Sequence, residues 1–174
     1  GHSHSHGDPH VWQDPRRVAG ALDTIATALA AHDIATCADA YRDELLALDA
    51  EIEALLAGIP DSARILVTSH ASLAYFADRY EFEVVGTVIP STNTLAATNA
   101  ADLADLAATI ERRDIPAIFT ERLESTADAD ALARRLGVDV VPLVTDALTD
   151  EPGSDTYVGM MRHNANAIAE ALTP

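Results

Sequence analysis

Three side chains of metal-binding type follow short apolar runs in this 174-residue sequence: His70, Glu121 and Asp155. Imidazole and carboxylate groups are the usual protein ligands of Zn²⁺, and carboxylates also suit Mn²⁺. Each side chain comes after a run that is typical of a buried strand, the first at 65–68. In a parallel sheet the ligand site lies at the carboxyl ends of the strands, so we expect the three groups to share one edge.

A fourth candidate, His10, lies in the segment DPHVW. Asp8-Pro9 is a turn signal that fixes the chain before the imidazole. We expect Val11 and Trp12 to anchor the histidine to a core, which would give it the rigid mounting that a ligand needs.

Each candidate also has a plain structural interpretation. His70 could begin a helix with its ring bonded to backbone, and His10 could be a surface histidine beside a buried tryptophan. Asp155 precedes Thr156-Tyr157, as an ordinary N-cap does. Glu121 could pair with an arginine, for which the candidates are Arg122 and Arg79. Because three independent accidents would have to share one edge, the joint placement favours a metal site.

The elements that must position these side chains alternate between helix and strand. Asp14-Pro15 predicts the start of a helix that continues over about 16–31, and apolar spacing predicts a longer helix over about 37–58. Runs typical of buried strands follow at 65–68, 84–89, 117–120 and 138–144. Further helices are predicted over about 70–79 and 100–112. Another helix is predicted to follow a cap at Ser125 or Thr126, and a last helix is predicted to end near Leu172. Four strands with helical crossovers predict an α/β fold with a four-stranded, mainly parallel sheet and flanking helices.

The charge balance excludes several classes of partner. Eleven basic residues, all arginine, stand against 28 acidic ones, for a net charge of −17. This argues against binding nucleic acid or an anionic membrane, and suits cations or a salty medium. No apolar run approaches the roughly 18 residues that span a bilayer. No signal peptide is recognisable, and we expect a longer gene product that extends upstream of the first residue.

The histidines of the first six residues alternate with serine or glycine. They would be mobile metal scavengers of low specificity, or else the remnant of a purification tag. These are His2, His4 and His6.

Four motifs in order carry a resemblance to a known family. They are DPHVWQDP at 8–15, VTSHASLAYF at 67–76 with Tyr80, FTE at 119–121, and DTY at 155–157 with Met160-Met161 and Asn164. Together they resemble the zinc/manganese solute-binding proteins of ABC transporters, a group that includes the streptococcal-type metal-binding adhesins. The resemblance covers essentially the whole chain.

The resemblance implies two α/β lobes joined by one long helix, with the metal held between the lobes. Residues 1–12 would be the end of a His-rich loop with the DPHVW motif, and 13–60 a helix plus the long connecting helix. Residues 61–174 would be the carboxy-terminal lobe. The amino-terminal lobe, which supplies a further ligand histidine in the family, has no counterpart in this sequence.

The family's ligands fall on His10, His70 and Asp155, with Glu121 as an auxiliary group nearby. A histidine at position 70 and the His-rich tract favour Zn²⁺ over Mn²⁺. The implied function is extracytoplasmic capture of a divalent metal ion and its delivery to an ABC-type permease, by a protein that is membrane-anchored in full-length form and is not an enzyme. The alternative is a metal-dependent hydrolase with the same three ligands and Glu121 as general base.

Overall fold

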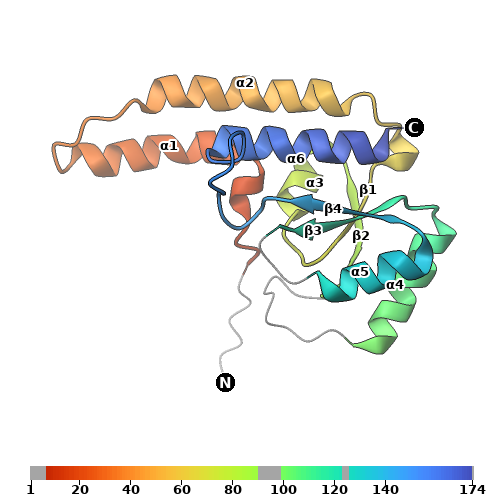
Figure 1. Cartoon of the computed structure of the whole chain (residues 1–174). Coiled ribbons are helices and arrows are strands. Elements are labelled where there is room, and N and C mark those ends of the chain that lie inside the picture. Colours follow the sequence, from red (N-terminus) through yellow and green to blue (C-terminus); the bar gives the residue numbers. More distant parts are fainter. Residues whose placement is uncertain (1–6, 90–98, 123–125, 174) are drawn as a thin grey trace.

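The computed structural model describes residues 7–89, 99–122 and 126–173. This part of the chain contains one sheet of four parallel strands in the order β2-β1-β3-β4 (Figure 1). The strands are β1 (Ile65–Thr68), β2 (Glu83–Thr87), β3 (Ala117–Glu121) and β4 (Asp139–Leu143). The predicted α/β fold with a parallel sheet is therefore confirmed. The histidines at positions 2, 4 and 6, the segment 90–98 between a predicted strand and a predicted helix, and Ser125 lie outside the described residues.

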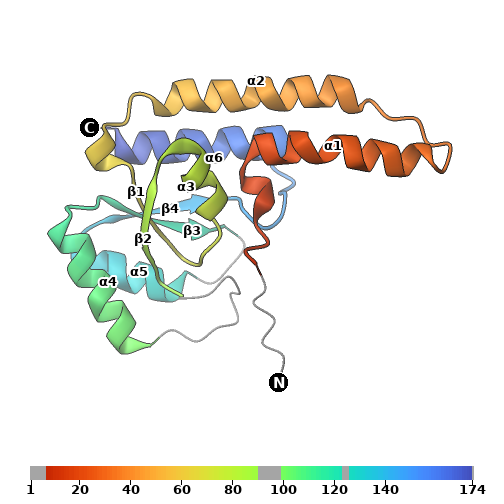
Figure 2. The ribbon, with the colours of Figure 1, turned by 180° about the vertical axis from the view of Figure 1, so that it is seen from behind.

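Helices cover both faces of the sheet (Figures 1 and 2). One face carries α1 (Pro15–Ala30), α2 (Ala38–Leu56), α3 (Ala74–Tyr80) and α6 (Tyr157–Leu172), and the other carries α4 (Ala100–Arg112) and α5 (Ala127–Leu136). Side chains of the central strands alternate between the two apolar cores, as the period of two along a strand requires. Leu66 and Phe119 point into the first core, whereas Val67 and Ile118 point into the second.

The starts of α1 and α3 determine where the segments that contain His10 and His70 lie. Asp14 caps α1 as predicted, because its carboxylate accepts hydrogen bonds from the backbone N–H groups of Arg16 and Arg17. The helix predicted over 70–79 begins only at Ala74. His70 therefore lies in the loop between β1 and α3 and does not begin a helix.

The helices α1 and α2 run antiparallel, and their connection extends beyond the sheet (Figures 1 and 2). α2 packs against α6, which in turn packs against β4. The expected role of α2 as a connector between two lobes stays a prediction. Within the described ranges, no helix combines the length and apolar character needed to cross a bilayer.

Candidate metal centre

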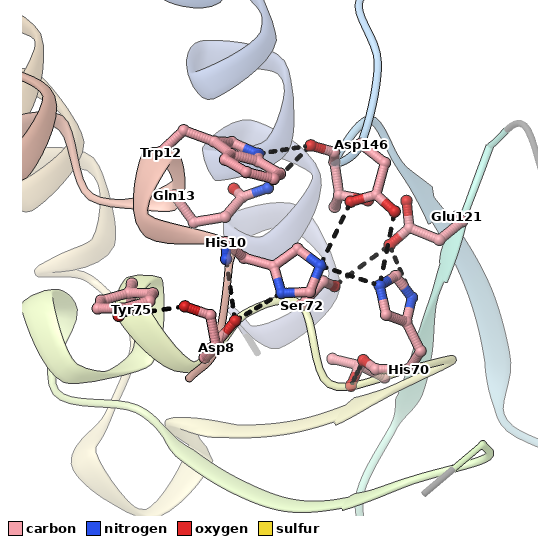
Figure 3. Close-up of polar contacts among 11 residues, drawn as sticks. Asp8, His10, Trp12, Gln13, His70, Ser72, Tyr75, Glu121 and Asp146 are labelled. Carbon is pink, nitrogen blue, oxygen red and sulfur yellow. Dashed lines mark hydrogen bonds and ion pairs between the residues drawn. The ribbon is translucent and has the colours of Figure 1, made fainter. Parts of the chain in front are cut away.

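Two buried imidazoles and one carboxylate converge at the carboxyl edge of the sheet (Figure 3). His10 is 3% exposed and His70 is fully buried. Their Nε2 atoms lie 3.4 Å apart. Asp146 places one carboxylate oxygen 3.6 Å from Nε2 of His10 and the other 3.7 Å from Nε2 of His70. One ligand atom from each of the three residues can therefore face a common point.

The spacing of these atoms fits a small divalent cation. In a tetrahedral site with metal–ligand distances of about 2.0–2.2 Å, ligand atoms lie roughly 3.3–3.6 Å apart. The two Nε2 atoms, 3.4 Å apart, fall in this range. The 3.6 and 3.7 Å separations belong to the two different oxygens of Asp146, and one ligand atom from each of the three residues lies within 4.8 Å of the others. The side chain of Asp146 is 43% exposed, so the site meets solvent at the carboxylate corner.

His10 is held from behind by the turn that precedes it. The Asp8 carboxylate accepts a hydrogen bond from the backbone N–H of His10 at 2.9 Å and contacts Nδ1 of its ring at 2.6 Å. Because a carboxylate can only accept, Nδ1 carries the hydrogen and the lone pair of Nε2 faces the site. Trp12 packs against the apolar core, as expected, whereas Val11 is 44% exposed and does not anchor the segment.

His70 is positioned by the end of β1. Its carbonyl oxygen accepts hydrogen bonds from the Thr68 hydroxyl at 2.7 Å and from the Ser72 backbone N–H at 2.9 Å, which fixes a tight turn. Glu121, at the end of β3, has a carboxylate oxygen 3.5 Å from Nδ1 of this ring. The Ser72 hydroxyl donates to the same Glu121 oxygen at 3.2 Å. Glu121 thus stands behind His70, much as Asp8 stands behind His10.

Asp146 follows residues 144–145, whose backbone is hydrogen-bonded by side chains from two other parts of the chain. The amide of Asn164, in α6, donates to the Val144 carbonyl at 2.7 Å and accepts from the Val144 N–H at 2.9 Å. The Thr145 carbonyl accepts from Trp12 Nε1 at 2.8 Å and from Gln13 Nε2 at 3.2 Å. The segment that carries Asp146 is therefore bonded directly to the segment that carries His10.

The structure brings together His10, His70 and Glu121 of the predicted site residues, but not Asp155. Asp155 is exposed, directly before the Thr156 N-cap of α6, and is not part of the group. The physical reason is its distance along the loop: Asp146 comes three residues after β4 ends, whereas Asp155 comes twelve residues after it. Asp146 is not among the residues predicted from the sequence, although a carboxylate three residues after a strand is a signal that the sequence offers.

The two arginines considered as partners of Glu121 have carboxylate partners elsewhere. Arg79 pairs with Asp49 at 2.6 Å, and Arg122 pairs with Glu151 at 2.8 Å. Glu121 itself is 5% exposed, and the contacts described above direct it toward His70 and Ser72.

Comparison with known proteins gives consistent matches over nearly the whole chain. Residues 1–171 match the family described as zinc-uptake complex component A, periplasmic. The chain is 33% identical to the zinc-binding protein TroA of Treponema pallidum, over 95% of this chain and 57% of that protein. It is 32% identical to the manganese-binding lipoprotein MntA of Bacillus subtilis, over 95% of this chain and 58% of that protein.

A solved structure gives the same result for the fold. The periplasmic zinc-binding protein TroA from Treponema pallidum superimposes with a TM-score of 0.85 at 30% identity, over 100% of this chain and 67% of that one. The chain spans little more than half the length of the curated relatives it matches.

Proposed function

This chain belongs to the family of the periplasmic zinc-uptake component A, and from that premise we propose that it captures a divalent metal ion outside the cytoplasm and delivers it to an ABC-type permease. The metal is cargo and takes part in no reaction. The relatives TroA and MntA, named for zinc and manganese binding, support metal capture. The hydrolase alternative draws no support from these matches.

The observation that carries the proposal is the convergence of His10, His70 and Asp146. Two buried imidazoles with Nε2 atoms 3.4 Å apart leave little room for anything but a shared proton or a shared ion. The carboxylate that faces both nitrogens adds a negative charge, which favours a cation. We propose that these three groups are the metal ligands in this chain, with Glu121 and Asp8 holding the imidazoles from behind.

We propose zinc as the preferred ion. Two imidazoles and one carboxylate form a nitrogen-rich set that suits Zn²⁺, whereas Mn²⁺ is better served by carboxylate, carbonyl and water oxygens. Manganese remains the alternative, since relatives of both kinds match the chain.

We also propose that α2 connects to a second lobe in the whole protein, and that a histidine from that lobe completes the metal's coordination. The exposed Asp146 corner is the side from which such a ligand would approach. Closure of two lobes over the ion would then give the permease a shape to recognise.

The test is zinc binding measured by calorimetry on the 174-residue chain. His70→Ala and Asp146→Ala should each weaken zinc binding at least about tenfold, because each removes a ligand atom. Asp155→Asn, a carboxylate of the same loop outside the triad, is the matched control and should change the affinity less than about twofold. The measurements should be repeated with His2, His4 and His6 replaced by alanine, so that the tract does not add a second binding event.

Two results would contradict the assignment. Unchanged affinity in His70→Ala and Asp146→Ala would remove the proposed centre. Loss of affinity in Asp155→Asn, with Asp146→Ala unaffected, would return the carboxylate role to Asp155.

A further inference from the structure

A buried carboxylate outside the metal centre joins the two helices that follow the candidate histidines. Asp49 lies in the middle of α2 and is 1% exposed. Its oxygens accept hydrogen bonds from Arg16 Nε, Arg79 Nε and Arg79 Nη2, each at 2.6 Å, and from the Tyr80 hydroxyl at 3.2 Å. These four donors use about all the acceptor positions that a carboxylate has.

Such a group is a poor means of gaining stability. Removing a carboxylate from water carries a penalty that its partners roughly offset, and apolar residues of similar volume often serve at least as well. In some proteins, however, buried ionic groups fix the relative placement of the elements that supply them, because that placement pairs every charge. The elements fixed by Asp49 are α1, α2 and α3.

The path from Asp49 to His10 is short and begins at Arg16, whose side chain is 58% exposed. Arg16 lies in the first turn of α1, where Asp14 caps its backbone N–H at 2.8 Å. A single 3-10 turn, Val11–Gln13, separates this cap from His10, and the Gln13 N–H donates to the His10 carbonyl at 3.1 Å. A shift of the start of α1 along α2 would therefore carry the His10 ring with it.

The path to His70 runs through the other helix. Arg79 and Tyr80 form the last turn of α3, a seven-residue helix. Its first residue, Ala74, comes two residues after Ser72, whose hydroxyl bonds Glu121 and whose backbone bonds His70. The side chain of Arg79 is only 13% exposed, so its bidentate contact with Asp49 is shielded from solvent.

We infer that Asp49 is a positioning residue for the metal centre: by holding α1 and α3 to one point of α2, it sets the distance between the His10 and His70 imidazoles. The inference rests on the proposed function, because a distance between imidazoles matters only if they share an ion. The side-chain partners of Asp49 are Arg16, Arg79 and Tyr80, and Asp49 acts on the imidazoles through the two arginines.

The experiment compares zinc affinity and thermal stability in Asp49→Asn and two controls. Asp49→Asn preserves the side-chain shape but removes the charge, and we expect zinc affinity to fall about tenfold, at the low end of effects known for groups behind a ligand. Glu51→Gln, on the same helix, removes the 2.7 Å ion pair with Arg162 of α6 and should leave affinity unchanged. Leu172→Ala leaves a cavity in the apolar core between the sheet and the helices α2, α3 and α6. It should lower Tm without changing the affinity for zinc.

The outcomes separate the two proposals. If the unaltered chain does not bind zinc, the proposed function fails. If the unaltered chain binds zinc and Asp49→Asn binds it equally well, only the positioning role is overturned. The same holds if Leu172→Ala loses as much affinity as Asp49→Asn, since that would reduce the effect to general destabilisation. If Asp49→Asn does not fold, Arg16→Gln is the deciding variant, because it keeps the ion pair between Asp49 and Arg79. We expect Arg16→Gln to weaken zinc binding about threefold. An unchanged affinity for zinc would overturn the inference.

Discussion

At the scale of single residues, the centre is made of imidazoles with carboxylates behind them. Asp8 contacts Nδ1 of His10, and Glu121 stands 3.5 Å from Nδ1 of His70. In both cases the carboxylate contacts the nitrogen that points away from the other imidazole, which leaves Nε2 for an ion. The hydrogen bond to Asp8 thus orients the His10 ring before any metal arrives, and Glu121 places a carboxylate beside Nδ1 of His70.

Asp8→Asn should weaken zinc binding about tenfold. An amide keeps the turn and can still accept a hydrogen bond, but it removes the negative charge that makes His10 a stronger donor to the metal. Calorimetric titration with zinc measures the effect, and Asp61→Asn is the control, because it removes a fully exposed charge before the amino end of β1, whereas His70 follows the carboxyl end of that strand. Equal affinities for Asp8→Asn and the unaltered chain would show that the contact does not tune His10.

Of the four predicted site residues, the structure brings His10, His70 and Glu121 together, whereas Asp155 is not part of the group, and this difference has a definite reason. His10, His70 and Glu121 stand at strand ends or in a rigid turn, which local patterns reveal. The loop after β4 contains four acidic residues, at positions 146, 150, 151 and 155. Which of them faces the imidazoles depends on the bonds that Asn164, Trp12 and Gln13 make with residues 144–145, and no local pattern contains those contacts.

At the scale of elements, α2 holds α1 and α3 through the ion pairs of Asp49 with Arg16 and Arg79. Burial disfavours ionised Asp49, but hydrogen bonds from Arg79 and Arg16 and their positive charges outweigh burial and lower the pKa of Asp49. A lowered pKa means that the folded state favours the ionised form more than the unfolded state does. The resulting stabilisation is present above the unfolded pKa and is lost as the pH falls through the folded one.

Asp49→Asn should therefore destabilise the chain by about 3 kcal/mol at neutral pH, the usual effect of breaking a buried ion pair. The difference from the unaltered chain should be constant between about pH 7 and pH 5, and should shrink below about pH 4, where an unfolded aspartate takes up its proton. Urea unfolding at each pH measures it. A difference that stays undiminished at about pH 3 would show that the ionised form is not the source of the stabilisation.

Most element boundaries follow from the sequence because buried parallel strands give continuous apolar runs and the helices have clear apolar faces. The exception, the start of α3, has a local cause. The His70 carbonyl is occupied by the Thr68 hydroxyl and the Ser72 N–H, and this turn competes with a helix at that point. The same turn is what directs His70 to the sheet edge.

At the scale of the whole molecule, the dominant property is a net charge of −17 spread over 174 residues. Like charges held close in the folded state repel one another, and salt weakens this repulsion. The Debye length falls from about 10 Å at 0.1 M salt to about 3 Å at 1 M. The surface ion pairs, such as Arg162–Glu51, also weaken with salt, but each contributes little.

Raising NaCl from about 0.1 M to about 1 M should therefore raise the Tm by about 5 °C, equivalent to roughly 2 kcal/mol for a chain of this size. Differential scanning calorimetry without added metal is the measurement. KCl at equal concentration should act alike if screening is the cause. A Tm that falls with salt would show that attractive pairs outweigh the repulsion.

The position of Trp12 gives the molecule an internal optical probe. It is the sole tryptophan of the chain, and its ring lies 5.4 Å, centroid to centroid, from the His10 imidazole while its indole nitrogen bonds the Thr145 carbonyl. Its fluorescence thus originates between two of the segments that supply ligands. Since these segments come from opposite ends of the polypeptide, a change in emission on adding an ion reports both occupancy and the completed assembly of the fold, without any label.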